Sequence, residues 1–378
     1  MWVYFLIFFI ILFTYLGTRN NTKNVPLLAT TLTLLAIFVG ISDMLGGYDR
    51  YIYGELFDGM ADVTKSGGNP WKSNSFQFYS GEFGYGTLCA LISFITKNRY
   101  IFIFIVTIII YILLFISIRD YTNNYPFAVL LFMALWFFFT FTYLRQVLSA
   151  TTAWLAIRYI SRRDLKRFLL VWFIAFSLHN SAIVFLPVYF VPIKKYSEKT
   201  ILTIMGIALF LGLTPLPSAI FQAYGEVNQD RSNIESYAIE GSFRIAYLLE
   251  AVFFLYIILS NYNKIPPKTK NIVLTNMALI FCAILLVFIK SENGGRLGWF
   301  YLISCISTIT TVCHLKNAKQ HKVIMLLVSF YLYFRIIYAW GSLLSPYKTF
   351  FTNGYRKVDY IHRLYEYDSN YDKDKFYR

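Results

Sequence analysis

The sequence lacks the short motifs that mark several common enzyme classes. It contains no G-x-x-x-x-G-K-[ST] loop, no H-E-x-x-H pair and no G-x-S-x-G elbow, which argues against P-loop ATPases, zinc peptidases and serine hydrolases. No segment implies a bound metal ion or another cofactor. The function must therefore be sought in the charged residues and in their positions along the chain.

Cysteine and acidic residues are scarce. The four cysteines (Cys89, Cys282, Cys305 and Cys313) lie singly in apolar segments, which indicates small core residues and excludes a disulfide framework or a zinc site. Twenty Asp and Glu stand against 35 Lys and Arg, for a formal net charge of +15. Because the basic residues lie in short turns between apolar runs, as membrane proteins require, we exclude nucleic acid as a partner.

Apolar residues are abundant instead. They make up 57% of the 378 residues, whereas soluble domains average about 45–50%. Runs close to the roughly 20 residues that a membrane span needs recur along most of the chain. We therefore predict an all-α polytopic integral membrane protein with about ten transmembrane helices, a re-entrant hairpin and extracytoplasmic loops. The predicted spans are 2–17, 26–42, 100–118, 126–142, 146–160, 200–218, 243–260, 272–290, 297–314 and 322–341.

The sequence divides into a membrane part and a short tail. Residues 1–347 are predicted to form one membrane-embedded domain with outer loops at 43–99 and 219–243. Residues 348–378 mix both charges with many tyrosines, which is typical of an interfacial or disordered end.

Six turns rich in Lys and Arg determine the predicted orientation, since basic turns stay in the cytoplasm. They are 18–25, 119–125, 158–167, 194–199, 261–271 and 314–322. Segment 168–193 has basic flanks at both ends, yet it is too short for two full spans. A re-entrant hairpin with His179-Asn180-Ser181 at its tip resolves this conflict, and one ordinary span is the alternative.

With this topology, several ionisable side chains fall within or beside the outer half of the membrane. A central arginine costs about 2.5–3.5 kcal/mol there, so we predict a cationic cavity that holds phosphate or pyrophosphate. The candidates for binding pyrophosphate are Arg145, Arg244, Arg296 and Arg335. The candidates for chemistry are His179, Glu82 and Arg145, with Asp49 and Glu250 as further acids.

Each candidate also has a simpler interpretation. Arg145 can end a helix and extend to the interface, and His179 can be an ordinary core histidine. Arg244 and Glu250 do not share a helical face. Asp49 and Glu82 are expected in loops, where carboxylates are normally solvated.

An ordered set of motifs resembles the EpsG-type, Wzy-like polysaccharide polymerases of bacterial envelopes. The likeness spans about residues 45 to 350, and one position departs from it, because Arg50 follows Asp49 where a small or acidic residue is expected. The motifs are Tyr48-Asp49-Arg50-Tyr51-Ile52-Tyr53, Glu82-Phe83-Gly84-Tyr85, Leu144-Arg145-Gln146-Val147-Leu148-Ser149-Ala150, Leu178-His179-Asn180-Ser181-Ala182, Arg296-Leu297-Gly298-Trp299-Phe300-Tyr301 and Ser345-Pro346-Tyr347.

The resemblance implies a metal-independent, inverting glycosyltransferase in the bacterial cytoplasmic membrane, with its site facing outward. Its substrates would be oligosaccharide repeat units on undecaprenyl diphosphate, and its further partners membrane lipids and a chain-length regulator. Three alternatives remain, namely a flippase for the same lipids, a membrane O-acyltransferase and a scaffold subunit. A flippase commonly has paired halves, and no internal repeat is found here.

Overall fold

The computed structural model is helical throughout its main body and describes residues 1–18, 21–227, 242–315, 318–355, 359–364 and 368–378. Among these, four helical stretches are long and apolar enough to cross a membrane: α6 (Arg99–Tyr121), α15 (Thr269–Val287), the stretch Gly294–Cys313 and α17 (Lys319–Ala339). Shorter apolar helices accompany them. The all-helical class is therefore confirmed for the described residues and is consistent with a membrane protein, while the number of crossings stays a prediction.

All ten predicted spans contain helix, and several are interrupted. The first two are α1 (Trp2–Gly17) and α2 (Val25–Gly40), and two later ones are α11 (Glu198–Leu213) and α14 (Ile245–Leu259). Three spans consist of two segments each: α7 (Tyr125–Leu135) with η3 (Phe137–Phe141), α8 (Leu144–Trp154) with α9 (Ile157–Arg162), and η6 (Gly294–Tyr301) with α16 (Leu302–Cys313).

Asparagine caps explain where several of these helices begin. The side chains of Asn24, Asn98 and Asn124 each accept a hydrogen bond from an amide in the first turn of α2, α6 and α7. A proline also stands in the first turn of α2 and α7. A capping oxygen satisfies an amide that has no partner within the helix, and proline loses nothing there.

The segment after the basic turn forms a helical hairpin. It consists of α10 (Leu165–Leu178) and the 3₁₀ segment η4 (Asn180–Phe190), and the chain reverses at His179, which is extended. The rings of Phe168 and Tyr189 lie 4.9 Å apart, and Nη1 of Arg163 donates to the carbonyl of Tyr189 at 2.6 Å. Both ends of the hairpin therefore lie together, as a re-entrant segment requires, although its depth in a membrane stays a prediction.

The predicted outer loop 43–99 is largely helical, and its position outside the membrane stays a prediction. It contains α3 (Tyr48–Lys65), η1 (Pro70–Lys72), α4 (Asn74–Gln77), η2 (Ser80–Glu82) and α5 (Phe83–Ile95). At Gly84 an added Cβ would collide with the side chain of Ser177, so glycine lets the start of α5 pack against the tip of the hairpin.

The second predicted outer loop, 219–243, is described only in part. It begins within α12 (Leu216–Val227), and residues 228–241 lie outside the described residues.

Of the two expectations for the tail, the disordered end is wrong for its described residues, and the interfacial end stays a prediction. They follow α18 (Gly341–Leu344) and include α19 (Tyr360–Leu364) and α20 (Ser369–Lys373). Tyr371 and Lys375 are fully buried, and the carbonyl of Lys375 accepts a hydrogen bond from the Asn98 side chain at 2.7 Å. The tail therefore packs against the region where α3 and α6 meet.

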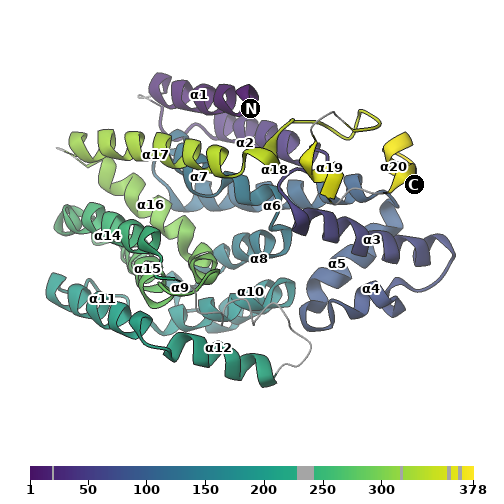
Figure 1. The fold of residues 1–378 in the computed structure, drawn as a ribbon. Helices are drawn as coiled ribbons and strands as arrows, with labels where there is room; N and C mark the ends of the chain where they lie inside the picture. Colours follow the sequence, from purple (N-terminus) through teal and green to yellow (C-terminus); the bar gives the residue numbers. More distant parts are fainter. Residues whose placement is uncertain (19–20, 228–241, 316–317, 356–358, 365–367) are drawn as a thin grey trace.

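The bundle has two chemically different ends (Figure 1). The predicted cytoplasmic turns gather at the left end in that view, and α3, α4, α5, α19 and α20 gather at the right. Hydrogen bonds and an ion pair join the turns at the left: Thr22 with Tyr125, Asp120 with Arg158, Asn124 with His314, Lys195 with Tyr262, and Ser260 with His321. Six basic turns that were predicted to share one side thus do so.

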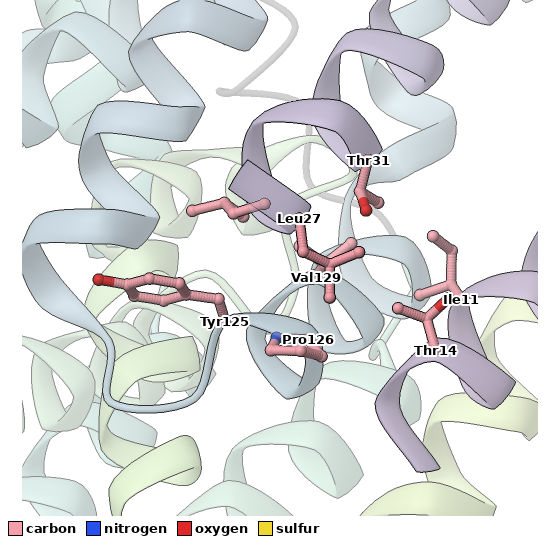
Figure 2. Close-up of a pocket in the computed structure, with 8 residues that line it drawn as sticks. Ile11, Thr14, Leu27, Thr31, Tyr125, Pro126 and Val129 are labelled. Atoms are coloured by element: carbon pink, nitrogen blue, oxygen red, sulfur yellow. The ribbon is translucent and has the colours of Figure 1, made fainter. Parts of the chain in front are cut away.

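The helices α1, α2 and α7 pack closely beside the basic turns 18–25 and 119–125. Figure 2 shows the gap between them, where Ile11, Leu27 and Val129 approach one another. Its volume is about 10 Å³, at the lower limit of what a single water needs. This part of the molecule is structural core and offers no room for a substrate.

Candidate functional site

A polar cavity of about 470 Å³ opens near the tip of the hairpin. Its lining comes from the start of α3, the turn before α8, the hairpin tip, the turn before η6 and the end of α17. The N-cap residues of five helical segments line the cavity, namely those of α3, α8, η4, η6 and α18. Amides in the first turn of a helix have no partner within it and favour an anion.

Two glycines form part of the cavity wall before α3. Gly46 and Gly47 have φ angles of 105° and 109°, which favour glycine. An added Cβ on Gly46 would also lie 2.7 Å from that of Phe141. The close approach of these two segments therefore requires glycine at position 46.

Arg50, the residue that departs from the resemblance, stabilises the cavity wall through hydrogen bonds to the backbone. Its fully buried guanidinium donates to the carbonyls of Val39 at 3.1 Å, Ser42 at 2.9 Å and Phe141 at 3.0 Å. Three segments that meet beside the cavity are therefore held by one side chain. This geometry indicates a structural role for Arg50.

Arg145 is held inside the protein and does not extend to the interface. Its Nη1 donates to Oε2 of Glu82 at 2.5 Å, and the two side chains are only 12% and 7% exposed. The guanidinium also lies over the rings of Tyr53 and Tyr79, at 5.3 and 5.5 Å from their centroids. Its orientation is set by these contacts, which leaves it lining the cavity.

Glu82 connects the arginine to the hairpin tip. Its other oxygen, Oε1, accepts from the backbone N–H and the side-chain amide of Asn180 at 3.1 and 3.0 Å. Oε1 also lies 3.6 Å from Nδ1 of His179. Both oxygens of Glu82 are thus engaged with protein groups, so this carboxylate positions Arg145 and the tip.

His179 lines the cavity at the point where α10 ends. The backbone N–H of Ser181 donates to its Nδ1 at 3.2 Å, and the hydroxyl of Ser181 lies 2.8 Å from the same atom. With Nδ1 as an acceptor, the neutral ring carries its proton on Nε2. In this tautomer His179 offers a hydrogen-bond donor at Nε2.

Arg296 lies across the cavity, within the first turns of η6. Its guanidinium stacks on the ring of Tyr143 at 4.1 Å and donates to the Tyr143 hydroxyl at 2.9 Å. The side chain of Gln146 donates to the carbonyl of Arg296 at 3.3 Å. Among the described residues, Arg296 has no carboxylate partner, so its positive charge faces the cavity uncompensated by a direct ion pair.

Asp49 supplies an acid to the same space. It lies in the first turn of α3 and lines the cavity. Burial raises the pKa of this carboxyl above its usual value, and the nearby Arg296 and Arg145 oppose that shift. No hydrogen bond to its carboxylate is found within the described part of the chain.

Three predicted residues lie elsewhere. Arg244 is partly exposed and pairs with Glu292 at 3.2 Å. Arg335 is exposed on α17, and Glu250 lies on α14. None of these lines the cavity, so the structure separates them from Arg145, His179, Arg296, Asp49 and the adjoining Glu82.

Sequence reasoning missed the aromatic side chains that hold the two arginines. Tyr143 stacks on Arg296, and Tyr53 and Tyr79 flank Arg145. The sequence position could have indicated two of them, since Tyr143 directly precedes the Leu144-Arg145-Gln146 motif and Tyr53 ends the first motif. Tyr79 carries no comparable signal.

The donor set around the cavity does not resemble a metal centre. In the described residues, no three His, Cys, Asp or Glu side chains gather closely enough to hold a metal ion. The cavity instead presents two guanidiniums, an imidazole and a carboxylate.

The comparisons with known proteins agree with the resemblance in sequence. A family model described as the EpsG family matches residues 27–349, which is most of the chain and includes every residue of the cavity. No curated protein and no solved structure matches.

Proposed function

The chain belongs to the EpsG family of Wzy-like polysaccharide polymerases, and from this premise we propose that its polar cavity joins lipid-linked oligosaccharide repeat units. The donor is the growing chain on undecaprenyl diphosphate, and the acceptor is one lipid-linked repeat unit. The cavity opens at the end of the bundle away from the six basic turns, which the positive-inside rule assigns to the cytoplasm. We accordingly assign the reaction to the outer face of the cytoplasmic membrane.

The proposed reaction exchanges one C–O bond for another. A hydroxyl of the acceptor attacks the anomeric carbon of the donor, and the bond from that carbon to the diphosphate oxygen breaks. The hydroxyl proton passes to a base, while the lipid diphosphate leaves with the bonding electron pair. Attack from the side opposite the leaving group inverts the anomeric centre.

Arg145 and Arg296 are the groups that would stabilise the leaving diphosphate. Negative charge develops on its oxygens in the transition state, and preoriented cationic donors act most strongly on such charge. Both guanidiniums are already held in place by tyrosines and, for Arg145, by Glu82. Little reorganisation is then needed when the substrate binds.

We assign the two remaining roles, proton acceptance and hydrogen-bond donation to the substrate, to Asp49 and His179. Asp49 is the proposed base, because it lines the cavity and its raised pKa makes it a better proton acceptor than an ordinary aspartate. His179 is assigned a donor role through Nε2–H toward a phosphate or sugar oxygen. Glu82 is a positioning residue, since both of its oxygens are occupied.

The observation that carries this proposal is Arg296 facing the cavity opposite the Arg145–Glu82 pair. Two oriented guanidiniums around about 470 Å³ match a diphosphate that carries a sugar. A cavity for acyl transfer would need no such pair of cations.

The size profile of the surface polysaccharide tests the proposal. Deletion of the gene is expected to replace a ladder of long chains with single repeat units, and the intact gene should restore the ladder. If repeat units instead disappear from the surface altogether, the defect lies in export, and a flippase would replace the polymerase as the best account.

A further inference from the structure

A second cavity of similar size lies at the opposite end of the bundle. It has a volume of about 460 Å³ and runs between η4, α11 and α15. This is within the range of roughly 300–1,000 Å³ that is usual for ligand sites. Apart from Asn276 and the hydroxyl of Tyr196, its lining side chains are apolar. We refer to it as the apolar groove.

The polarity of the apolar groove changes along its length. On α15 the lining residues run from Asn276 through Ile280 to Ala283, which is about two helical turns or roughly 10 Å. Asn276 lies nearest the basic turn 194–199, because its side chain donates to the carbonyl of Lys194 at 3.1 Å. Ala283 lies deeper in the bundle. The groove thus has a polar end at the basic face and an apolar end within the membrane part.

The polar end carries an exposed positive charge. Nζ of Lys194 lies 5.3 Å above the ring of Tyr196, which lines the groove, and the lysine is exposed. Exposed Lys199 follows in the same turn. Anionic headgroups of the cytoplasmic leaflet attract basic residues at this level of a membrane protein.

One buried atom at the polar end lacks a donor. The side chain of Asn276 is buried, its amide nitrogen is satisfied by the carbonyls of Pro192 and Lys194, and its Oδ1 accepts no hydrogen bond from the described residues. A buried acceptor without a donor costs about 1–3 kcal/mol. A ligand with a hydroxyl near its anionic group would supply the missing donor.

We propose that the apolar groove binds one anionic phospholipid of the phosphatidylglycerol type. Its acyl chain lies along Met205, Ile280 and Ala283, its phosphate meets Lys194, and a headgroup hydroxyl donates to Oδ1 of Asn276. This site is separate from the polymerase cavity and goes beyond the proposed function. Because η4 links both, from the hairpin tip at Asn180 to the groove at Phe190, the lipid supports the segment that carries the tip.

Native mass spectrometry of the purified full-length protein tests the proposal. The probes are phosphatidylglycerol and phosphatidylcholine with identical acyl chains, added to delipidated protein. One phosphatidylglycerol per chain should be retained more strongly than phosphatidylcholine. Lys194→Gln should weaken its retention about fivefold, as expected for one lysine near an anionic headgroup.

Two further variants locate the site. Ala283→Trp fills the deep end and should abolish specific retention, whereas Lys319→Gln removes an exposed charge at the start of α17 and should leave it unchanged. Elution as a single monodisperse species confirms folding of each variant. Ala283→Met, a smaller filler, should give an intermediate loss if the tryptophan variant does not fold.

Three outcomes would overturn the proposal. The first is equal retention of both lipids. The second is wild-type retention of phosphatidylglycerol in both Lys194→Gln and the folded Ala283 variant. The third is displacement of phosphatidylglycerol by undecaprenyl phosphate, which would make the groove a binding site for the lipid tail of the substrate. Because the readout is lipid retention and not polymer length, its failure leaves the polymerase proposal to be judged separately.

Discussion

Two clusters of buried charge in the same half of the molecule differ in what surrounds them. In the tail cluster, Lys348 lies 2.6 Å from Asp359 and 3.2 Å from Asp43, and Lys375 lies 3.3 Å from Asp43. All four side chains are at most 3% exposed. The charges neutralise one another, and none of these residues lines the polar cavity.

The cavity cluster is arranged differently. Arg145 has one carboxylate partner, but Arg296 contacts a tyrosine and Asp49 faces both arginines across open space. A buried charge therefore does not by itself indicate a functional site. What distinguishes the cavity is that its charges face a volume that a ligand can occupy, whereas the tail cluster is closed by its own residues.

The largest expected effect concerns the proposed base. Asp49→Asn should lower the rate of chain extension by about 10²–10⁴-fold, the usual contribution of a positioned acid or base. In the wild type the carboxylate is the active form. Because its pKa is raised by burial, activity should decline on acidification with a midpoint above the ordinary value of about 3.9.

The measurement is the pH profile of chain extension by purified protein. Asp49→Glu is the matched variant, since it keeps the carboxylate and should retain part of the rate. An unchanged rate in Asp49→Asn would assign the base to another residue.

A substitution in the tail cluster should lower the stability of the protein without changing the rate of chain extension. Lys348→Met leaves Asp43 and Asp359 buried with one cation fewer, and breaking such a buried pair costs about 3–5 kcal/mol of unfolding free energy. The thermal unfolding midpoint should fall, while the rate per folded molecule should stay close to that of the wild type. Lys373→Met, at an exposed position of α20, is the control and should change neither. A large loss of rate in well-folded Lys348→Met would mean that the tail cluster takes part in catalysis.

A smaller effect is expected from the tyrosine that orients Arg296. Tyr143→Phe keeps the ring under the guanidinium but removes a hydrogen bond to a charged group, worth about 1.5–3 kcal/mol. Because Arg296 acts on the leaving diphosphate, the rate per folded molecule should fall roughly tenfold or more, while the loss of one hydrogen bond should lower the thermal unfolding midpoint by only a few degrees. Initial rates at saturating donor distinguish this from weaker binding. Equal rates for Tyr143→Phe and the wild type would show that the stacking contact alone positions Arg296.

The sequence was most informative where polar residues interrupt apolar runs. The reversal at His179-Asn180-Ser181 followed from two basic flanks that are too close together for two spans, and the structure contains that hairpin. The positions of the basic turns also predicted one common side for Arg145, Arg296 and Asp49, and these three residues line the same cavity. Charge and length along the chain are enough for such statements.

Other features depended on information that the sequence does not carry locally. Arg335 has the predicted depth, but depth does not specify which way a helix faces, and α17 directs this residue outward. The buried tail depends on contacts such as Lys375 with Tyr100, which are far apart in the chain. Between residues 43 and 82 the helices pack through tyrosines and paired charges, so their hydropathy resembled that of loops.

One experiment on four arginines tests whether the reaction takes place in the polar cavity. Each of Arg145→Gln, Arg296→Gln, Arg244→Gln and Arg335→Gln is expressed in the deletion strain, membrane levels are matched, and the surface polysaccharide ladder is recorded. The two cavity variants are expected to leave mainly single repeat units, since loss of one such donor costs about 10²–10³-fold in rate. The Arg244 and Arg335 variants should keep the ladder. Long chains in both cavity variants, or their loss only in the Arg244 and Arg335 variants, would contradict the placement of the reaction in this cavity.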